Sequence, residues 1–170
     1  MSIPIYYFDC VNNTNDTAKY LVENYDINHG MVISDFQQKG RGRYGNSWVS
    51  IKGNFMGSLF FRVKNYMCIK NMQEYSLNLL LKSLKKIFKT NIFQIKKPND
   101  LLINKRKVSG ILVESFKFKK NLFVIIGIGV NLIKNPKIKN YKTENLKKIF
   151  KKTIHPLMLG EVLINQMKVR

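Results

Sequence analysis

The chain has 170 residues, of which 45% are hydrophobic, and this composition favours one globular domain with a buried core over a disordered chain. The longest apolar run, LFVIIGIGV at residues 122–130, is much shorter than the roughly 18 residues that suggest a membrane span. The N-terminal MSIPIYYFDC lacks a basic region before an apolar core, which argues against a signal peptide. Cys10 and Cys68 show no metal-ligand spacing, so we expect two buried free thiols in a reducing, cytoplasmic compartment. We also expect no membrane partner.

The formal charge at pH 7 is +20, from 30 Lys and Arg against 10 Asp and Glu. Such a charge is compatible with a polyanionic partner, and a basic nucleic-acid-binding module stays open as an alternative function. A compositional bias toward Lys, Asn and Ile in the source genome produces the same excess without any such role. We therefore expect no specific nucleic-acid partner.

The predicted elements begin with a strand at residues 3–10 and a short helix over 16–25, with Asn15 or Asp16 as its N-cap. Strands are expected at 30–36 and 57–63, on either side of a glycine-rich stretch. Residues 69–89 are predicted to be helical, because apolar residues recur on one face at Leu77, Leu80, Leu81, Leu84 and Phe88.

Three strand-like pieces follow, at 91–97, at 100–115 with a turn near 104–106, and at 121–130. The segments LKKIF and HPLMLGEVLINQM are expected to form two helices, with Pro156 in the first turn of the second. Strands in hairpin-like pairs with helices between and after them predict an α+β fold with a mixed, largely antiparallel sheet flanked by helices. Such a sheet has edge strands that permit a homodimer, although no interface is identifiable.

The stretch QQKGRGRYGNSW at residues 37–48 could bind an anionic group. Gly40, Gly42 and Gly45 allow ligand atoms to approach main-chain N–H groups, and Arg41 and Arg43 have planar forks suited to phosphate or carboxylate. Trp48 provides a stacking face for a planar group. On its own, the same composition is equally typical of a mobile surface turn.

Two later stretches add polar groups. In KKPNDLLINKRKVSGILVE at 96–114, Asp100 either forms an Asx-type turn or holds Mg²⁺ or orients a basic side chain, and Lys107 precedes Gly110. In IGIGVN at 126–131, Leu132 replaces the third glycine of a dinucleotide fingerprint, so that interpretation fails. Strand glycines followed by Asn131 instead suggest close contact with a flat ligand such as a purine.

With these stretches in this order, residues 3–135 resemble the catalytic domain of biotin–protein ligases. That family has a GRGR-x-G…W loop, a K-W-P-N-D…K-x-x-G-I-L-x-E segment and a G-x-G-x-N strand, which stand here as GRGRYGNSW, KKPND…KVSGILVE and GIGVN. A family S-T-N element corresponds to Asn13–Thr14–Asn15. The resemblance implies a ligase that forms biotinyl-5′-AMP from biotin and MgATP and then transfers biotin to a lysine of a biotin carboxyl carrier domain of acetyl-CoA carboxylase.

The resemblance also implies roles for individual residues. The biotin site would comprise Asn13, Thr14, Asn15, Gln37, Gly40, Arg41, Gly42, Arg43, Lys107, Gly110 and Ile111. The ATP or adenylate site would comprise Arg43, Trp48, Asn99, Lys107 and Asn131, with Trp48 stacked on the adenine. The catalytic residues would be Arg43, Lys107 and Asp100, of which Asp100 would contact Mg²⁺ at most indirectly.

The sequence departs from the family pattern at three positions, which we expect to affect substrate affinity more than reaction type. Lys97 replaces a tryptophan, Asn46 replaces a common arginine, and Asn13 replaces a serine. We expect residues 1–170 to be a single catalytic domain of the monofunctional type, without an N-terminal winged helix or the small C-terminal β-barrel. Two further functions stay open, namely a lipoate or octanoate ligase or transferase, and a decayed ligase that only binds biotin or adenylate.

Overall fold

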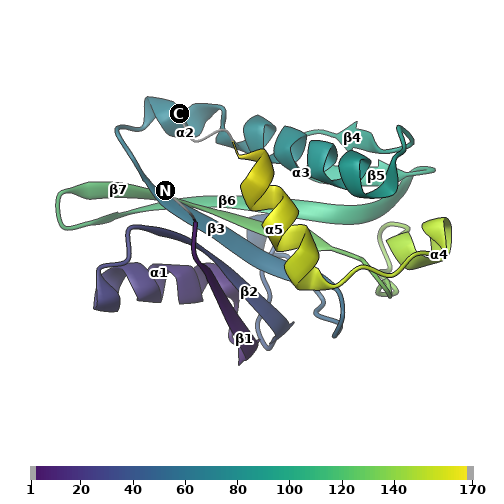
Figure 1. Ribbon diagram of the computed structural model, residues 1–170, viewed down its shortest axis with the longest axis horizontal. Coiled ribbons are helices and arrows are strands. Elements are labelled where there is room, and N and C mark those ends of the chain that lie inside the picture. The colour runs from purple at the N-terminus through teal and green to yellow at the C-terminus, as the bar shows by residue number, and fades with distance from the viewer. Residues whose placement is uncertain (1–2, 168–170) are drawn as a thin grey trace.

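The computed structural model describes residues 3–167, which fold around one seven-stranded sheet in the order β1-β2-β3-β7-β6-β5-β4 (Figure 1). The strands are β1 (Ile5–Val11), β2 (His29–Gln37), β3 (Phe55–Val63), β4 (Gln94–Lys96), β5 (Asp100–Ile103), β6 (Arg106–Phe118) and β7 (Asn121–Val130). Only β1 and β2 pair in parallel, and every other neighbouring pair of this sheet is antiparallel. The predicted α+β fold with a mixed, largely antiparallel sheet is confirmed.

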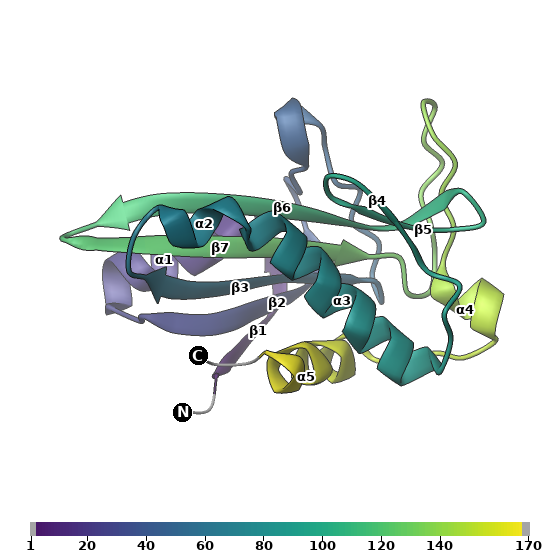
Figure 2. The same cartoon turned by 90° about the horizontal axis from the view of Figure 1, so that it is seen from above.

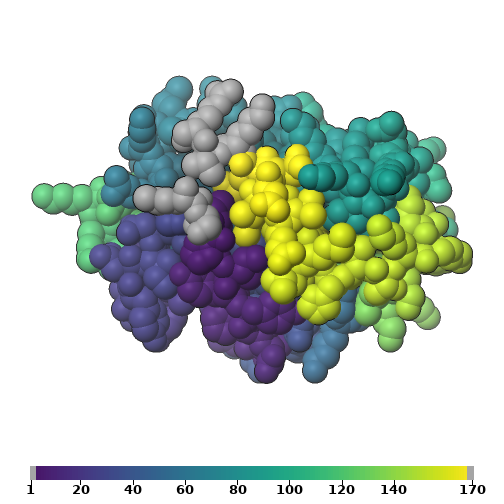
Figure 3. Space-filling view, in the orientation of Figure 1, coloured from purple at the N-terminus to yellow at the C-terminus, as the bar shows by residue number. Residues whose placement is uncertain are grey.

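Helices cover both faces of the sheet. They are α1 (Thr14–Tyr25), α2 (Met67–Lys70), α3 (Met72–Phe88), α4 (Leu146–Phe150) and α5 (Pro156–Gln166), with a short 3-10 helix η1 (Arg43–Gly45). Figure 1 shows α1 on one face and α3 and α5 on the other. In the space-filling view, α5 lies at the surface beside the N-terminal strand (Figure 3), where the rings of Tyr7 and His155 stack. None of the helices within residues 3–167 is long and apolar enough to span a membrane.

The strand period of two explains how β7 supports both layers. Ile126 and Ile128 face the core under α3 and α5, whereas Phe123 and Ile125 face the smaller core under α1. On α3, the predicted face is confirmed, because Leu77, Leu80 and Leu84 are buried and Leu81 and Phe88 pack at its margin.

Three local predictions were wrong. The N-cap of α1 is Asn13, whose Oδ1 accepts a hydrogen bond from the Asp16 backbone N–H at 2.8 Å, so the helix begins earlier than expected. The helical stretch from residue 69 is two helices that meet at Asn71. Cys10 and Cys68 are free but exposed, because one lies on the edge strand β1 and the other on the short, unburied α2.

The α1 face of the sheet is only partly covered, because α1 packs mainly on β2, β3 and β7. The first turn of α1 therefore adjoins an open part of the sheet at β6 and β7. Figure 2 shows two loops projecting beside this region, the loop between β2 and β3 that contains η1 (residues 38–54, the η1 loop) and the segment between β7 and α4 (residues 131–145). These loops and the uncovered strands form the walls of a polar cavity.

Candidate active site

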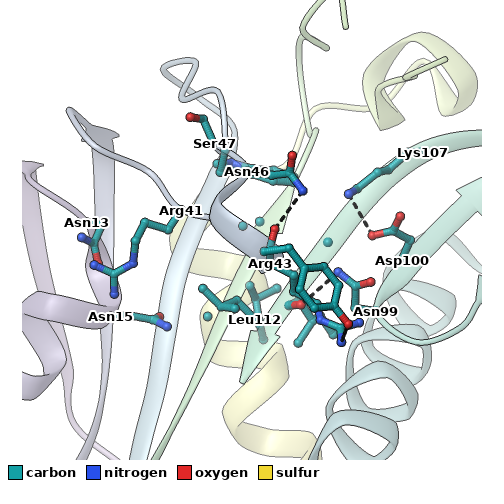
Figure 4. Close-up of a pocket in the computed structure, with 18 of the residues that line it drawn as sticks. Asn13, Asn15, Arg41, Arg43, Asn46, Ser47, Asn99, Asp100, Lys107 and Leu112 are labelled. Atoms are coloured by element: carbon teal, nitrogen blue, oxygen red, sulfur yellow. Dashed lines mark hydrogen bonds and ion pairs between the residues drawn. The ribbon is translucent and has the colours of Figure 1, made fainter. Parts of the chain in front are cut away.

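A cavity of about 470 Å³ lies on the α1 face of the sheet, between the start of α1, the η1 loop, the turn before β5 and the segment after β7. It brings together thirteen of the fifteen predicted site residues, several of which are labelled in Figure 4: Asn13, Thr14, Asn15, Gln37, Arg41, Gly42, Arg43, Trp48, Asn99, Asp100, Lys107, Gly110 and Ile111. Gly40 and Asn131 lie just outside its lining.

The floor of the cavity is a chain of buried neutral polar groups. Gln37 Oε1 accepts hydrogen bonds from the Thr14 N–H at 2.8 Å and the Thr14 hydroxyl at 3.1 Å. Ser58, which is fully buried on β3, lies with its Oγ 2.7 Å from Thr14 Oγ1 and 2.5 Å from Asn15 Oδ1. Because buried polar groups lose their hydration, this bonded arrangement holds each side chain in one orientation.

Arg41 is held by two carboxylates from different elements. Its Nη1 donates to Asp16 Oδ2 at 2.7 Å, and its Nη2 lies 3.2 Å from Glu114 Oε2. The hydrogen bond to Asp16 is the main cause that raises the pKa of Arg41. Burial raises the pKa of Asp16, but hydrogen bonds from Arg41 and Asn13 outweigh it, so that this pKa is lowered overall. The Arg41 fork therefore fixes the loop to α1 and β6 instead of pointing freely toward an anion.

The η1 loop closes on itself through backbone hydrogen bonds. The Trp48 N–H donates to Gly40 O at 2.9 Å, and the Gly42 N–H donates to Asn46 O at 2.6 Å. A Cβ at Gly40 would lie 2.5 Å from Trp48 O, so glycine is required there by the close approach of the two chain segments. Gly45 has φ +75°, which makes it the one glycine of the three whose backbone is left-handed.

Arg43 is the first residue of the 3-10 turn η1 in this loop. Its Nη2 donates to the Tyr44 hydroxyl at 2.9 Å, and its guanidinium carbon lies 4.8 Å from the centre of the Tyr44 ring. Asn46 donates from Nδ2 to the Arg43 carbonyl at 2.8 Å, as drawn in Figure 4. Among the described residues, Arg43 forms no ion pair, so its charge is available to a ligand in the cavity.

Lys107 is the second of these cavity cations, and unlike Arg43 it is held by close neighbours. Its Nζ lies 2.8 Å from Asp100 Oδ1, and the two side chains are only 16% and 18% exposed. The contact is an ion pair and not a hydrogen bond, because Asp100 Oδ1 has no hydrogen-bond partner among the described residues despite the short distance. The same Nζ lies 5.9 Å from the Trp48 ring and 5.2 Å from the Tyr141 ring, within cation–π range.

Trp48 packs against strand glycines. A Cβ at Gly129 would come within 2.4 Å of the indole, and one at Gly110 would lie 3.3 Å from it. The flat group expected against the strand glycines is therefore the protein's own indole, and a Cβ at Gly127 would likewise meet Asn15 Oδ1 at 2.5 Å. The indole Nε1 is buried without a hydrogen-bond partner among the described residues.

Asn131 is 2% exposed and lies outside the lining of the cavity. Its Nδ2 donates to Glu144 O at 3.1 Å and approaches Lys107 O at 3.5 Å, which ties the end of β7 to the start of β6. Its Oδ1 has no partner among the described residues and remains a free acceptor. Asn99 similarly contacts β6, since its Nδ2 lies 3.3 Å from Ile111 O.

Sequence reasoning did not single out Ser58, Glu114 or Tyr141. Ser58 and Glu114 sit in strands whose apolar alternation gives no sign of a polar network, although Glu114 belongs to the quoted KVSGILVE segment. Tyr141 lies in the segment between β7 and α4, which carries no regular pattern. All three are found through contacts made by residues distant in the chain.

The charge arrangement determines what the cavity can bind. Its lining holds three cations, Arg41, Arg43 and Lys107, and a single carboxylate, Asp100. Within residues 3–167, no three His, Cys, Asp or Glu side chains gather as a metal site. A neutral polar floor in the same cavity as the cations Arg43 and Lys107 suits a ligand with a neutral hydrogen-bonding head and an anionic tail.

Comparisons with known proteins show which sequences and folds this chain is similar to. The chain is 34% identical over 134 residues to the bifunctional ligase/repressor BirA of Bacillus subtilis, covering 76% of this chain and 41% of that protein. The fold superposes on Leishmania major biotin protein ligase in complex with biotinyl-5-AMP (TM-score 0.84, 21% identity, 96% of this chain and 72% of that one). It also superposes on Aquifex aeolicus biotin protein ligase in complex with biotin and ATP (TM-score 0.76, 25% identity, 96% and 68%).

The chain thus spans about two fifths of the length of the Bacillus relative that it matches. The family match extends across the elements that build the cavity, from β1 to the end of β7. Residues 7–131 match the biotin/lipoate A/B protein ligase family, and they include the η1 loop, the Lys107 strand and the GIGVN segment. The chain belongs to the biotin/lipoate A/B protein ligase family.

Proposed function

We propose that this protein is an ATP-dependent biotin–protein ligase of the biotin–[acetyl-CoA-carboxylase] ligase type. The observation that carries the proposal is the placement of two fixed cations, Arg43 and Lys107, at one cavity with a neutral polar floor. Biotin has a neutral ureido head and a carboxylate tail, and ATP adds phosphates that must approach that carboxylate.

The floor residues would bind the ureido ring. Thr14 and Gln37 offer a hydroxyl and an amide at the buried end of the cavity, and Asn15 is held beside them. Neutral donors and acceptors recognise a urea group better than charges do, because the urea itself carries none. The valeryl chain would then run along Gly110 and Ile111 toward Lys107.

The first step would join the two substrates. A carboxylate oxygen of biotin attacks the α-phosphorus of ATP, the bond from that phosphorus to the bridging oxygen breaks, and pyrophosphate leaves. Two anions meet in this step and charge gathers on the phosphate, so Lys107 and Arg43 would lower the barrier as preorganised cations. Mg²⁺ would neutralise phosphate charge when bound. Asp100, the one carboxylate in the cavity lining, would contact the bound Mg²⁺ through water beside Lys107.

The adenine would lie against Trp48. Trp48 lines the cavity and offers its ring for stacking, whereas the buried Oδ1 of Asn131 lies outside the lining and would accept from an adenine amino group only after a local shift exposes it. In the second step, the amine of an acceptor lysine attacks the acyl carbonyl, and AMP leaves. A biotin carboxyl carrier domain is the proposed acceptor, and a closed η1 loop would keep water from the anhydride.

A lipoate or octanoate substrate is the second candidate, because the family includes lipoate enzymes and the fold also superposes on Plasmodium falciparum LipL1 in complex with lipoate (TM-score 0.59). Those acids lack a ureido ring and would leave the polar floor unpaired, which costs affinity. Parallel assays of ATP-dependent pyrophosphate release with biotin, lipoate and octanoate separate the candidates. We expect release with biotin, and release with lipoate or octanoate but not biotin would contradict the specificity proposed here.

A further inference from the structure

Glu114 on β6 connects two parts of the site without lining the main cavity. Its Oε2 accepts a hydrogen bond from Asn15 Nδ2 at 2.6 Å, and both of its oxygens lie within 3.3 Å of Arg41 Nη2. One carboxylate thus contacts the polar floor on one side and the η1 loop on the other. Figure 4 shows Arg41 lying between Asn13 and Asn15, close to the start of α1.

The contact with Asn15 sets the direction of the floor network. An ionised carboxylate only accepts hydrogen bonds, so Asn15 must turn its Nδ2 toward Glu114 and its Oδ1 toward Ser58. Ser58 Oγ in turn lies beside the Thr14 hydroxyl, which contacts Gln37 Oε1. The orientation of one amide therefore fixes the donors and acceptors that a ligand meets on the floor.

The contact with Arg41 determines where the loop lies. Arg41 pairs with Ser47 as an isolated bridge within the loop, so holding its guanidinium holds the loop backbone. Asp16 is the second carboxylate of this arrangement and anchors the same guanidinium to α1 at 2.7 Å. Arg41, Asp16 and Glu114 together form what we call the Arg41 clamp.

We propose that Glu114 is a positioning residue that couples closure of the η1 loop to the orientation of the biotin-binding floor. The effect of this coupling on catalysis rests on the proposed function. The mechanical part, that Glu114 holds the η1 loop and orients Asn15, does not depend on it. With Glu114 ionised, the loop is held over the cavity and Asn15 presents its oxygen inward. Neutralising Glu114 weakens both contacts, because each loses its charged acceptor, and an amide in its place also turns a donor toward Arg41 or Asn15.

The mechanical part is tested on the ligand-free protein by limited trypsin digestion, following cleavage after Arg43 by mass spectrometry. Glu114→Gln is expected to speed this cleavage by about tenfold, the effect of losing one charge-assisted hydrogen bond. Glu23→Gln is the matched control, because Glu23 also pairs with a cation (Lys19, at 3.7 Å) on α1 but contacts no part of the loop. Equal cleavage rates in wild type and both variants would overturn the proposal.

The coupling itself is tested by a double-mutant cycle with Arg41→Gln, Glu114→Gln and the double variant. The readouts are KM for biotin and kcat of biotin-dependent pyrophosphate release. Glu114→Gln is expected to raise KM for biotin about tenfold while changing kcat less than about threefold, and the double variant is expected to be less impaired than the product of the two single effects, although worse than Arg41→Gln alone because the contact with Asn15 is also lost. Fully additive effects, or a fall in kcat at unchanged KM, would overturn the coupling.

The two tests also separate failure of this inference from failure of the proposed function. If no variant and no wild-type protein uses biotin, the function is wrong while trypsin digestion still decides whether Glu114 holds the loop. A thermal unfolding midpoint measured for each variant identifies global destabilisation, and Glu114→Asp gives a second variant that keeps the charge. Glu114→Asp is expected to recover part of the trypsin resistance, and no recovery would contradict a role for the charge.

Discussion

Lys107 Nζ lies 2.8 Å from Asp100 Oδ1, and the two side chains come from adjacent antiparallel strands, β6 and β5. A lysine on a strand is usually solvated, but this one is largely buried between its carboxylate partner and the rings of Trp48 and Tyr141. The carboxylate and the rings restrict where its charge can move. This preorganisation is what makes Lys107 the central cation of the proposed adenylation step.

Lys107→Ala is expected to lower the rate of biotin-dependent pyrophosphate release by at least ~10²-fold, the usual effect of removing one preorganised group that stabilises developing charge. The measurement is the single-turnover rate at saturating ATP and biotin. Lys117→Ala is the control, since Lys117 lies exposed on the far end of the same strand. A near-normal rate in the Lys107 variant would remove this residue from the mechanism.

Arg43→Ala is expected to lower adenylate formation by ~10²-fold and to weaken retention of the product, because Arg43 lines the cavity and has no ion-pair partner among the described residues. Retention is measured as the rate at which labelled biotinyl-5′-AMP leaves the protein on dilution. Arg62→Ala, at an exposed position on β3, serves as the matched arginine control. Unchanged release together with an unchanged rate would contradict the role given to Arg43.

Gly129→Ala is expected to displace the Trp48 indole, because the new Cβ would lie 2.4 Å from ring atoms that have no room to retreat toward the strand. Trp48 is the only tryptophan of the chain, so its fluorescence reports on this contact directly. The emission maximum should move to longer wavelength as the ring meets water. Ser115→Ala, on an exposed part of β6, should leave the spectrum unchanged, and an unshifted Gly129 variant would contradict the packing described here.

The pH dependence of the Arg41 clamp follows from the lowered pKa of Asp16. A carboxyl group whose pKa is lower in the folded than in the unfolded state stabilises the fold above its unfolded pKa, and this contribution disappears as the pH falls through the folded value. Wild type should therefore exceed Asp16→Asn in unfolding free energy at pH 7, with the difference vanishing as the pH falls below the ordinary value of 3.8. Urea unfolding across a pH series from neutral to acid measures this difference, and a constant gap would contradict the assignment.

Much of the fold could be predicted from the sequence, because its signals are local. The leucine period of α3, the turn near Asn104 and Pro156 in the first turn of α5 all gave the correct elements. The missed N-cap of α1 shows the limit of this approach. Asn13, Asn15 and Asp16 are all plausible caps by composition, and only the burial of Thr14 and Asn15 in the floor network decides among them.

The candidate site was predictable where residues recur in a family pattern, and not where distant side chains meet. The sequence placed Arg41 and Lys107 near the cavity, but it did not distinguish the arginine held by Asp16 and Glu114 from the available Arg43. Arg41 and Arg43 each follow a glycine in the Gly-Arg-Gly-Arg sequence of residues 40–43. Their different roles depend on partners that lie 25 and 73 positions from Arg41 along the chain.

The proposed ligase activity is tested by a single-turnover reaction with purified protein, biotin and α-labelled ATP, followed by addition of a biotin carboxyl carrier domain. We expect labelled biotinyl-5′-AMP only when biotin is present, and then release of labelled AMP together with biotin on the acceptor lysine. Adenylate that forms but is never transferred would support a decayed ligase instead. Absence of any biotin-dependent adenylate would contradict the account.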